Sequence, residues 1–308
     1  MDVLKIGTRG SGLALRQTEL VAQRIEERYP GLATEIVRIK TQGDRMQNIS
    51  LVKIGGKGVF VKEIEEALLR GEIHCAVHSM KDVPTELPGG LTIDIIAERE
   101  DPRDVLISRD NIKLESLPQG ARIGTGSLRR RMQLLNVFPD CEIVAIRGNL
   151  DTRMQKITTE GLDGVILAAA GMRRMGWGAR VSQYIPVEVM VPAAGQGAVG
   201  IEVRVDDNEV RELLAFLNDP DTMTAVRGER AFLKHLGGGC QVPIAAFARK
   251  VGESLRLKGV VGSPDGTRMI PHAVEGPCDA CEELGRTMAE YILSRGGRAI
   301  LDEVYEEL

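Results

Sequence analysis

The chain has 308 residues, a formal net charge of −4 and only 3% aromatic residues. A chain of this length exceeds one ordinary core, so we expect two or three domains. The acidic balance and the scarcity of aromatic rings disfavour a nucleic-acid-binding protein, which needs basic surface and stacking platforms. The longest wholly apolar run, 165–170, is far shorter than the ~18 residues that cross a membrane, so we expect no membrane association.

The residues after Met1 do not form the apolar core of a secretory signal, and we expect a cytoplasmic protein. Cysteines in such a chain favour free thiols over a disulfide framework. Cys278 and Cys281 form a CxxC pattern without a second CxxC or a histidine pair, so we expect no metal site. Arginine outnumbers lysine by 29 to 11. This bias favours bidentate recognition of carboxylates or phosphates, although genome composition could also produce it.

The first hundred residues alternate predicted strands with predicted helices, which is typical of α/β folds. A strand over 4–7 ends in a glycine-rich turn and leads into a helix that ends before Pro30. The free N–H groups at the start of a helix bind anions, and Arg9 and Ser11 lie where they would add donors. The turn is not a P-loop, because GxxxxGK[ST] is absent from it.

A second loop of interest follows the predicted strand 75–79. Lys81 and Asp82 lie just after this strand, and ligands gather at the carboxyl ends of strands in open α/β sheets. A solvated turn is an equally good interpretation of this loop taken alone. Further strands are predicted over 36–40 and 91–97, and the charged segment 98–104 is typical of a domain boundary.

A second α/β pattern begins at residue 105, and arginines follow its strands. The predicted strands cover 105–107, 122–124, 141–146 and 165–167, and the arginines that follow them are Arg129, Arg130, Arg131, Arg147, Arg153, Arg173 and Arg174. The helix dipole disfavours cations in the first turn of the helix that starts at Leu128. We therefore expect an anionic ligand to compensate the arginines there.

The last third of the chain reads as α+β. The small-residue segment 191–200 predicts a hinge, and helices over 224–236 and 281–293 enclose predicted strands. Between them lies Gly237-Gly238-Gly239-Cys240-Gln241-Val242-Pro243. Glycines permit positive φ and could present the Cys240 thiol. The alternative is a glycine-rich helix end followed by a buried cysteine.

Six motifs, in this order, resemble those of the porphobilinogen deaminase family, and the resemblance extends from Thr8 to the final helix. They are 55–60 (GGKGVF), 76–84 (AVHSMKDVP), 124–130 (GTGSLRR), 147–149 (RGN), 192–197 (PAAGQG) and 238–243 (GGCQVP). Gly126 departs from the family pattern, which has serine there.

The resemblance implies three domains in an α/β and α+β architecture. Domain 1 comprises 1–98 and 198–217, domain 2 comprises 104–192, and the smaller α+β domain 3 comprises 221–308. The first two would resemble the lobes of periplasmic binding proteins and flank a cleft that contains the active site.

The resemblance also implies an enzyme, a hydroxymethylbilane synthase of the transferase class in tetrapyrrole and heme biosynthesis. Such an enzyme condenses four porphobilinogen molecules head to tail, with loss of ammonia, onto a covalently bound dipyrromethane cofactor. Hydrolysis then releases hydroxymethylbilane. The small molecule porphobilinogen would be the partner, and a monomer is implied.

By the same resemblance, Asp82 would be the catalytic residue and Cys240 would hold the cofactor through a thioether. The residues implied around the carboxylates of the cofactor are Lys81, Thr125, Ser127, Arg129, Arg130 and Arg147. Those implied near the incoming substrate are Arg9, Ser11, Phe60, Arg153, Arg174 and Gln196. A non-catalytic two-lobed anion-binding protein is the alternative, but it explains neither Asp82 nor Cys240.

Overall fold

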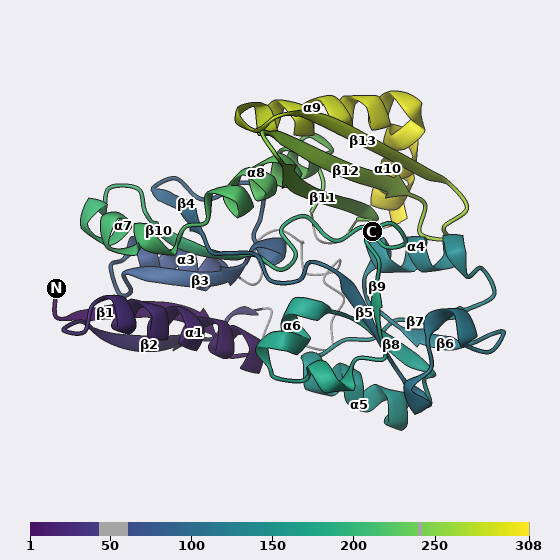
Figure 1. Cartoon of the computed structure of the whole chain (residues 1–308), viewed down its shortest axis with the longest axis horizontal. Coiled ribbons are helices and arrows are strands. Elements are labelled where there is room, and N and C mark those ends of the chain that lie inside the picture. The colour runs from purple at the N-terminus through teal and green to yellow at the C-terminus, as the bar shows by residue number, and fades with distance from the viewer. Residues whose placement is uncertain (43–60, 240–241, 308) are drawn as a thin grey trace. The chain divides into compact units, whose positions relative to one another are not determined.

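The computed structural model of the chain describes residues 1–42, 61–239 and 242–307 (Figure 1). The chain forms two compact units, Met1–Glu100 with Ala198–Met223, and Asp101–Gly197 with Thr224–Leu308. The division into three domains with the boundaries given above stays a prediction.

The first unit is built on a five-stranded sheet of order β2-β1-β3-β10-β4. In this sheet β1 is parallel to β2 and β3, and β10 is antiparallel to β3 and β4. The strands are β1 (Val3–Arg9), β2 (Ala33–Ile39), β3 (Cys75–Ser79), β4 (Leu91–Ile96) and β10 (Val199–Arg204). The helices are α1 (Gly12–Arg28), α3 (Lys62–Leu69) and α7 (Asn208–Leu214), with short 3₁₀ turns η2 (Met80–Asp82) and η6 (Ala215–Leu217).

The second unit begins with a sheet of the same plan, in the order β7-β6-β8-β5-β9. Three neighbouring strands are again parallel and the fourth is antiparallel. The strands are β5 (Asp104–Ser108), β6 (Arg122–Gly124), β7 (Glu142–Val144), β8 (Gly164–Ala168) and β9 (Gln183–Ile185). The helices are α4 (Leu128–Val137), α5 (Leu150–Thr159) and α6 (Ala169–Arg174), with 3₁₀ turns η3 (Arg109–Asn111), η4 (Leu114–Ser116) and η5 (Gly178–Arg180).

The end of the chain forms a three-stranded antiparallel sheet with helices, and α9 contacts β12 and β13 (Figure 1). The elements are α8 (Pro220–His235), β11 (Ile244–Val251), β12 (Ser254–Gly262), β13 (Met269–Pro277), η7 (Cys278–Ala280), α9 (Cys281–Ile292), η8 (Leu293–Gly297) and α10 (Arg298–Glu307). The predicted α/β and α+β class is therefore confirmed.

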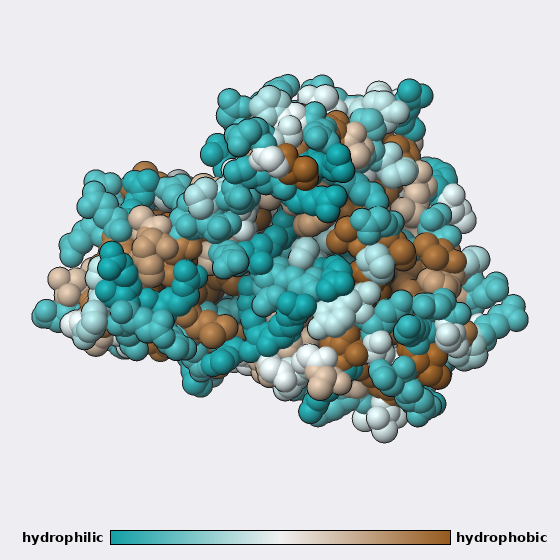
Figure 2. Space-filling view, in the orientation of Figure 1, coloured by the Kyte–Doolittle hydropathy of each residue, from teal (hydrophilic) through white to brown (hydrophobic). Residues whose placement is uncertain are grey.

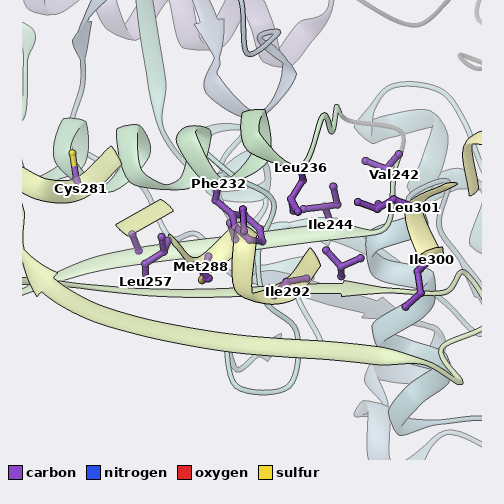
Figure 3. Packing of buried hydrophobic residues seen from close by; sticks show 14 of the residues in the cluster. Phe232, Leu236, Val242, Ile244, Leu257, Cys281, Met288, Ile292, Ile300 and Leu301 are labelled. Carbon is purple, nitrogen blue, oxygen red and sulfur yellow. The ribbon is translucent and has the colours of Figure 1, made fainter. Parts of the chain in front are cut away.

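The hydrophobic core of this part of the chain is formed by residues of α8, α9 and α10 together with residues of β11 and β12. Phe232 of α8 and Met288 of α9 are fully buried in it, and Ile300 of α10 also belongs to it (Figure 3). Cys281 lies in the same core at 4% exposure, and burial raises the pKa of its thiol. Cys281 therefore packs as a small hydrophobic residue.

Hydrophilic residues dominate the face of the molecule that Figure 2 shows. None of the helices in the described ranges combines the length and the hydropathy that a membrane-crossing segment needs. Across 1–42, 61–239 and 242–307, no group of three potential metal ligands comes together.

Candidate functional site

Asp82 and Lys81 lie on a turn that is anchored from both sides. Met80 and Val83 are buried at 2% and 4% exposure, and the Met80 N–H donates to the Ala198 carbonyl oxygen at 3.0 Å. Asp82 between them is exposed. The backbone of Met80–Asp82 forms a 3₁₀ turn. The predicted position at the carboxyl end of a buried strand is confirmed.

Arg9 ends β1, and Ser11 caps the helix that follows. The Ser11 hydroxyl accepts a hydrogen bond from the Ala14 N–H at 3.3 Å. The Ala14 N–H is one of the N–H groups at the start of α1 that the sequence predicts to bind an anion, and the Ser11 hydroxyl already accepts its hydrogen bond.

Asp104 is the buried centre of a charge cluster in the second unit. Its carboxylate accepts hydrogen bonds from Arg129 at 2.7 and 3.2 Å and from Arg130 at 3.0 and 2.7 Å. The Gln196 amide donates to it at 3.1 Å. Three of the predicted site residues are thus brought together by one carboxylate that sequence reasoning did not single out.

The topology of the sheet explains how Asp104 reaches these residues. β5 runs antiparallel to β8, and Asp104 pairs with Ala168, so β5 begins at the edge where β8 ends. The helix α4 also starts beyond that edge, after the parallel strand β6. The anion that compensates Arg129 and Arg130 in the first turn of α4 is therefore part of the chain itself.

The electrostatics of the cluster favour an ionised carboxylate. Asp104 is fully buried, and Arg129 and Arg130 are exposed by only 4% and 5%. Burial alone would raise the pKa of the Asp104 carboxyl, but the two guanidinium groups hold it well below its usual range. Further hydrogen bonds to the carbonyl oxygens of Val191 and Ile166 fix the guanidinium planes.

Thr125 and Ser127 form the turn before α4, and their hydroxyl groups accept hydrogen bonds within this turn and from the first turn of α4. The Ser127 N–H donates to the Thr125 hydroxyl at 3.3 Å, and the Ser127 hydroxyl accepts from the Arg130 N–H at 3.4 Å. Gly126 lies between them, where a Cβ would come within 2.5 Å of the Ile146 carbonyl oxygen. This close approach gives a steric reason for the glycine that departs from the family pattern.

Arg147 is held at the end of the segment after β7 by a turn that requires glycine. Gly148 has φ +110°, and a Cβ there would lie 2.7 Å from Thr152. The Arg153 guanidinium donates to the Gly148 carbonyl oxygen at 2.8 Å. Both arginines are half-buried at the carboxyl edge of the sheet.

A second buried carboxylate, Glu229, holds the segment that carries Gln196. Glu229 is fully buried and accepts hydrogen bonds from the N–H groups of Gly195 at 2.6 Å and Ala248 at 2.7 Å. The Arg174 guanidinium donates to the Gly197 carbonyl oxygen at 2.7 Å, on the other side of Gln196. Sequence reasoning missed Glu229, because nothing in its helix distinguishes it from a surface acid.

Cys240 and Phe60 lie outside the described residues, but the approach to Cys240 is described. The N–H groups of Gly237 and Gly238 donate to the carbonyl oxygens of Lys234 and Leu233, which is a Schellman end to α8. Gly237 has φ +68°, and a Cβ on Gly238 would come within 2.5 Å of Ile244. The glycine-rich helix end considered from the sequence is thus confirmed for these two residues.

Comparison with known proteins shows strong similarity along the whole chain. A family model described as "Porphobilinogen deaminase, dipyromethane cofactor binding domain" matches residues 4–212, and one described as "Porphobilinogen deaminase, C-terminal domain" matches residues 223–294. The porphobilinogen deaminase of Geobacter metallireducens is 56% identical over 303 residues, with 98% of this chain and 95% of that protein covered. That of Syntrophus aciditrophicus is 53% identical over 301 residues, with 98% of each covered.

Similarity to solved structures is weaker. The periplasmic aliphatic sulphonate binding protein SsuA from Escherichia coli has 14% identity and a TM-score of 0.40, with 76% of this chain and 70% of that chain covered. A similarity of this size assigns no function.

Proposed function

The chain belongs to the porphobilinogen deaminase family, and we propose how its own residues carry out the reaction of that family. It is an enzyme that joins porphobilinogen units with loss of ammonia, and it uses a dipyrromethane cofactor. The observation that carries this assignment is the 56% identity over 98% of the chain. The non-catalytic anion-binding alternative is not favoured, because the two curated relatives named above are both porphobilinogen deaminases.

The donors of the second unit, together with Lys81 of the first, fit a dipyrromethane, whose two pyrroles each carry an acetate and a propionate. We assign its carboxylates to Lys81, Thr125, Ser127, Arg129, Arg130 and Arg147. Planar guanidinium groups bind carboxylates in bidentate fashion, and Asp104 fixes two of these groups before any ligand arrives. When bound through the Cys240 sulfur, the dipyrromethane supplies the terminal pyrrole carbon to which porphobilinogen is joined.

Asp82 is the catalytic carboxylate in this proposal. Loss of ammonia leaves a positive charge on the substrate, spread over its methylene group and its pyrrole nitrogen. An ionised carboxylate beside the pyrrole N–H stabilises that charge, and fixed charges act most strongly where they need not reorganise. The buried flanks of Asp82, Met80 and Val83, give its turn such a fixed position.

The incoming substrate also carries an acetate and a propionate. We assign these to Arg9, Ser11, Arg153, Arg174 and Gln196, with Phe60 beside the pyrrole ring. The reaction belongs to the transferases, with porphobilinogen added four times before hydroxymethylbilane is released. We also propose a cytoplasmic monomer without a nucleic-acid partner, in line with the net charge of −4.

The first experiment is the intact mass of the purified protein beside a Cys240→Ser variant. We expect an excess equal to two deaminated porphobilinogen units in the parent and none in the variant. A parent mass equal to the bare sequence, unchanged after incubation with porphobilinogen, would contradict both the activity and the attachment site.

A second experiment separates catalysis from cofactor attachment. Asp82→Asn should keep the mass excess but lose about 10²-fold or more of the turnover, because the amide carries no charge. Glu86→Gln, which neutralises an exposed acid four residues further along the chain, is the matched control and should retain turnover. Near-normal turnover of Asp82→Asn would refute the catalytic role.

A further inference from the structure

Three ionisable side chains lie buried in the first unit, away from the residues assigned above. The His78 imidazole Nε2 is 2.9 Å from Oε2 of Glu202, and the two side chains are exposed by only 4% and 1%. Glu65 of α3 is buried at 7% exposure and interacts electrostatically with both. The proposed reaction uses none of the three.

The pairing of the strands places His78 and Glu202 on the face of the sheet that α3 covers. Gly200 pairs with His78 and Glu202 pairs with Ala76, so His78, Ala76 and Glu202 share one face. Ala76 packs there in a cluster with Ile64 and other residues of α3. The surroundings are apolar, so charges in this layer are poorly solvated.

The charge balance of this layer calls for a proton. Glu202 Oε1 is buried and has no hydrogen-bond partner among the described residues. Two buried carboxylates beside one imidazole leave excess negative charge, which is costly in an apolar layer. Burial raises the pKa of Glu65 to about 7, the Glu202 charge raises it as well, and His78 opposes the rise. Glu65 therefore keeps a proton well above the pH at which a surface glutamate loses it.

Other charges near this layer are directed elsewhere. The Glu66 charge also raises the pKa of Glu65, and Glu66 forms a surface pair with Arg70 at 3.6 Å. Arg204, two residues after Glu202, donates to backbone carbonyl oxygens of Leu68 and Ile73. On the neighbouring strand β4, Asp94 pairs with Arg211 at 2.8 Å.

The same two strands anchor the turn that carries Lys81 and Asp82. The Met80 N–H bonds to Ala198, and the Met80 side chain covers Gly200, where a Cβ would lie 2.2 Å from its sulfur. Along this one segment, Ala198 and Gly200 thus contact Met80, and Glu202 contacts His78. The bond between His78 and Glu202 is the side-chain hydrogen bond in this series.

We propose that His78, Glu202 and Glu65 form a buried polar network that positions the Met80–Asp82 turn for the reaction. This inference rests on the proposed role of Asp82. His78 and Glu202 are positioning residues in it, and neither needs to contact substrate. When Glu65 ionises, a second negative charge competes with Glu202 for His78 and weakens this side-chain contact between β3 and β10.

The test compares kcat and KM of Glu65→Gln with those of the parent from about pH 5 to about pH 9. Because glutamine cannot ionise, the ratio of variant to parent kcat should rise at least about threefold as the pH passes through 7, while KM changes less than about twofold. Glu66→Gln, the exposed neighbour on the same helix, is the matched control and should show no such rise. A constant ratio for Glu65→Gln, or an equal rise for Glu66→Gln, would overturn the network.

A second variant tests positioning without relying on Asp82. Glu202→Gln should lower kcat by about tenfold with the mass excess retained, and should speed hydrogen exchange of the Met80 N–H. Unchanged exchange and unchanged kcat would refute positioning. If Glu202→Gln does not fold, Glu65→Gln decides alone, because its amide replaces a carboxyl of equal size. Full turnover of Asp82→Asn would instead refute the catalytic role of Asp82. Hydrogen exchange of the Met80 N–H does not depend on that role, so the two failures are distinguishable.

Discussion

Replacing Asp104 by asparagine tests whether one buried carboxylate organises the arginines of the second unit. The variant keeps the shape of the side chain but leaves Arg129 and Arg130 buried without the charge that accepts four hydrogen bonds from them. Removing one partner of a buried ion pair costs about 3–5 kcal/mol. Because whole domains are stable by only about 5–15 kcal/mol, about a fifth of the stability or more is at stake.

The assay for this variant is urea unfolding followed by circular dichroism, beside the intact mass of each protein. The lowered pKa of Asp104 means that its contribution is fully present at neutral pH and is lost only in acid, so the measurement belongs at pH 7. We expect a clear fall in the unfolding midpoint and incomplete loading with dipyrromethane. Arg131→Gln, an exposed neighbour in the same helix, is the control. Equal midpoints and full loading in both variants would refute the reasoning.

Three further predictions concern the turn after β7, the end of α8 and the buried acid of α3. Gly148→Ala should destabilise by about 1–3 kcal/mol and weaken porphobilinogen binding, since φ +110° and Thr152 both oppose a Cβ; an unchanged melting temperature would contradict this. Tyr305→Phe removes the 2.8 Å hydrogen bond that the Tyr305 hydroxyl donates to the Gly237 carbonyl oxygen. It should lower the free energy of unfolding, measured by thermal denaturation, by about 1 kcal/mol. An unchanged free energy would mean that α10 does not support the loop at Gly237. Because the pKa of Glu65 is raised from 4.5 to about 7, the stability that its protonated form contributes is complete below pH 4.5 and is lost as the pH rises through 7. The free energy of unfolding should fall by about 3 kcal/mol over this range in the parent and should not fall in Glu65→Gln. The same fall in Glu65→Gln would exclude Glu65 as its source.

Local sequence patterns predicted most of the elements, because apolar periodicity depends on near neighbours. The strands 75–79 and 122–124 and the start of α4 are found where the patterns place them. The short strand β9 was missed, since its three residues show no apolar run. The helix α10 was also missed, although Ile300, Leu301 and Val304 recur at helical spacing and their burial bears out that signal.

The charge cluster could not be predicted because its parts are distant in sequence. Arg129 and Arg130 need an anion, as their position in the first turn of α4 predicts, but that anion is a residue of the chain and not a ligand. Asp104 lies 25 residues before Arg129 in the sequence and reaches it because β5 runs antiparallel beside β8. In the sequence it is the last acid of a charged segment that was interpreted as a boundary.

The order of strands in the first unit has a consequence for synthesis on the ribosome. β10 lies between β3 and β4, yet β4 ends at residue 96 and β10 begins at residue 199. At ordinary translation rates the intervening residues take roughly 5–20 s to make. During that time the nascent sheet lacks an inner strand, and β3 and β4 have unpaired edges that can associate with other chains. Nascent copies of this protein should therefore depend on chaperones until about two thirds of the chain has been translated.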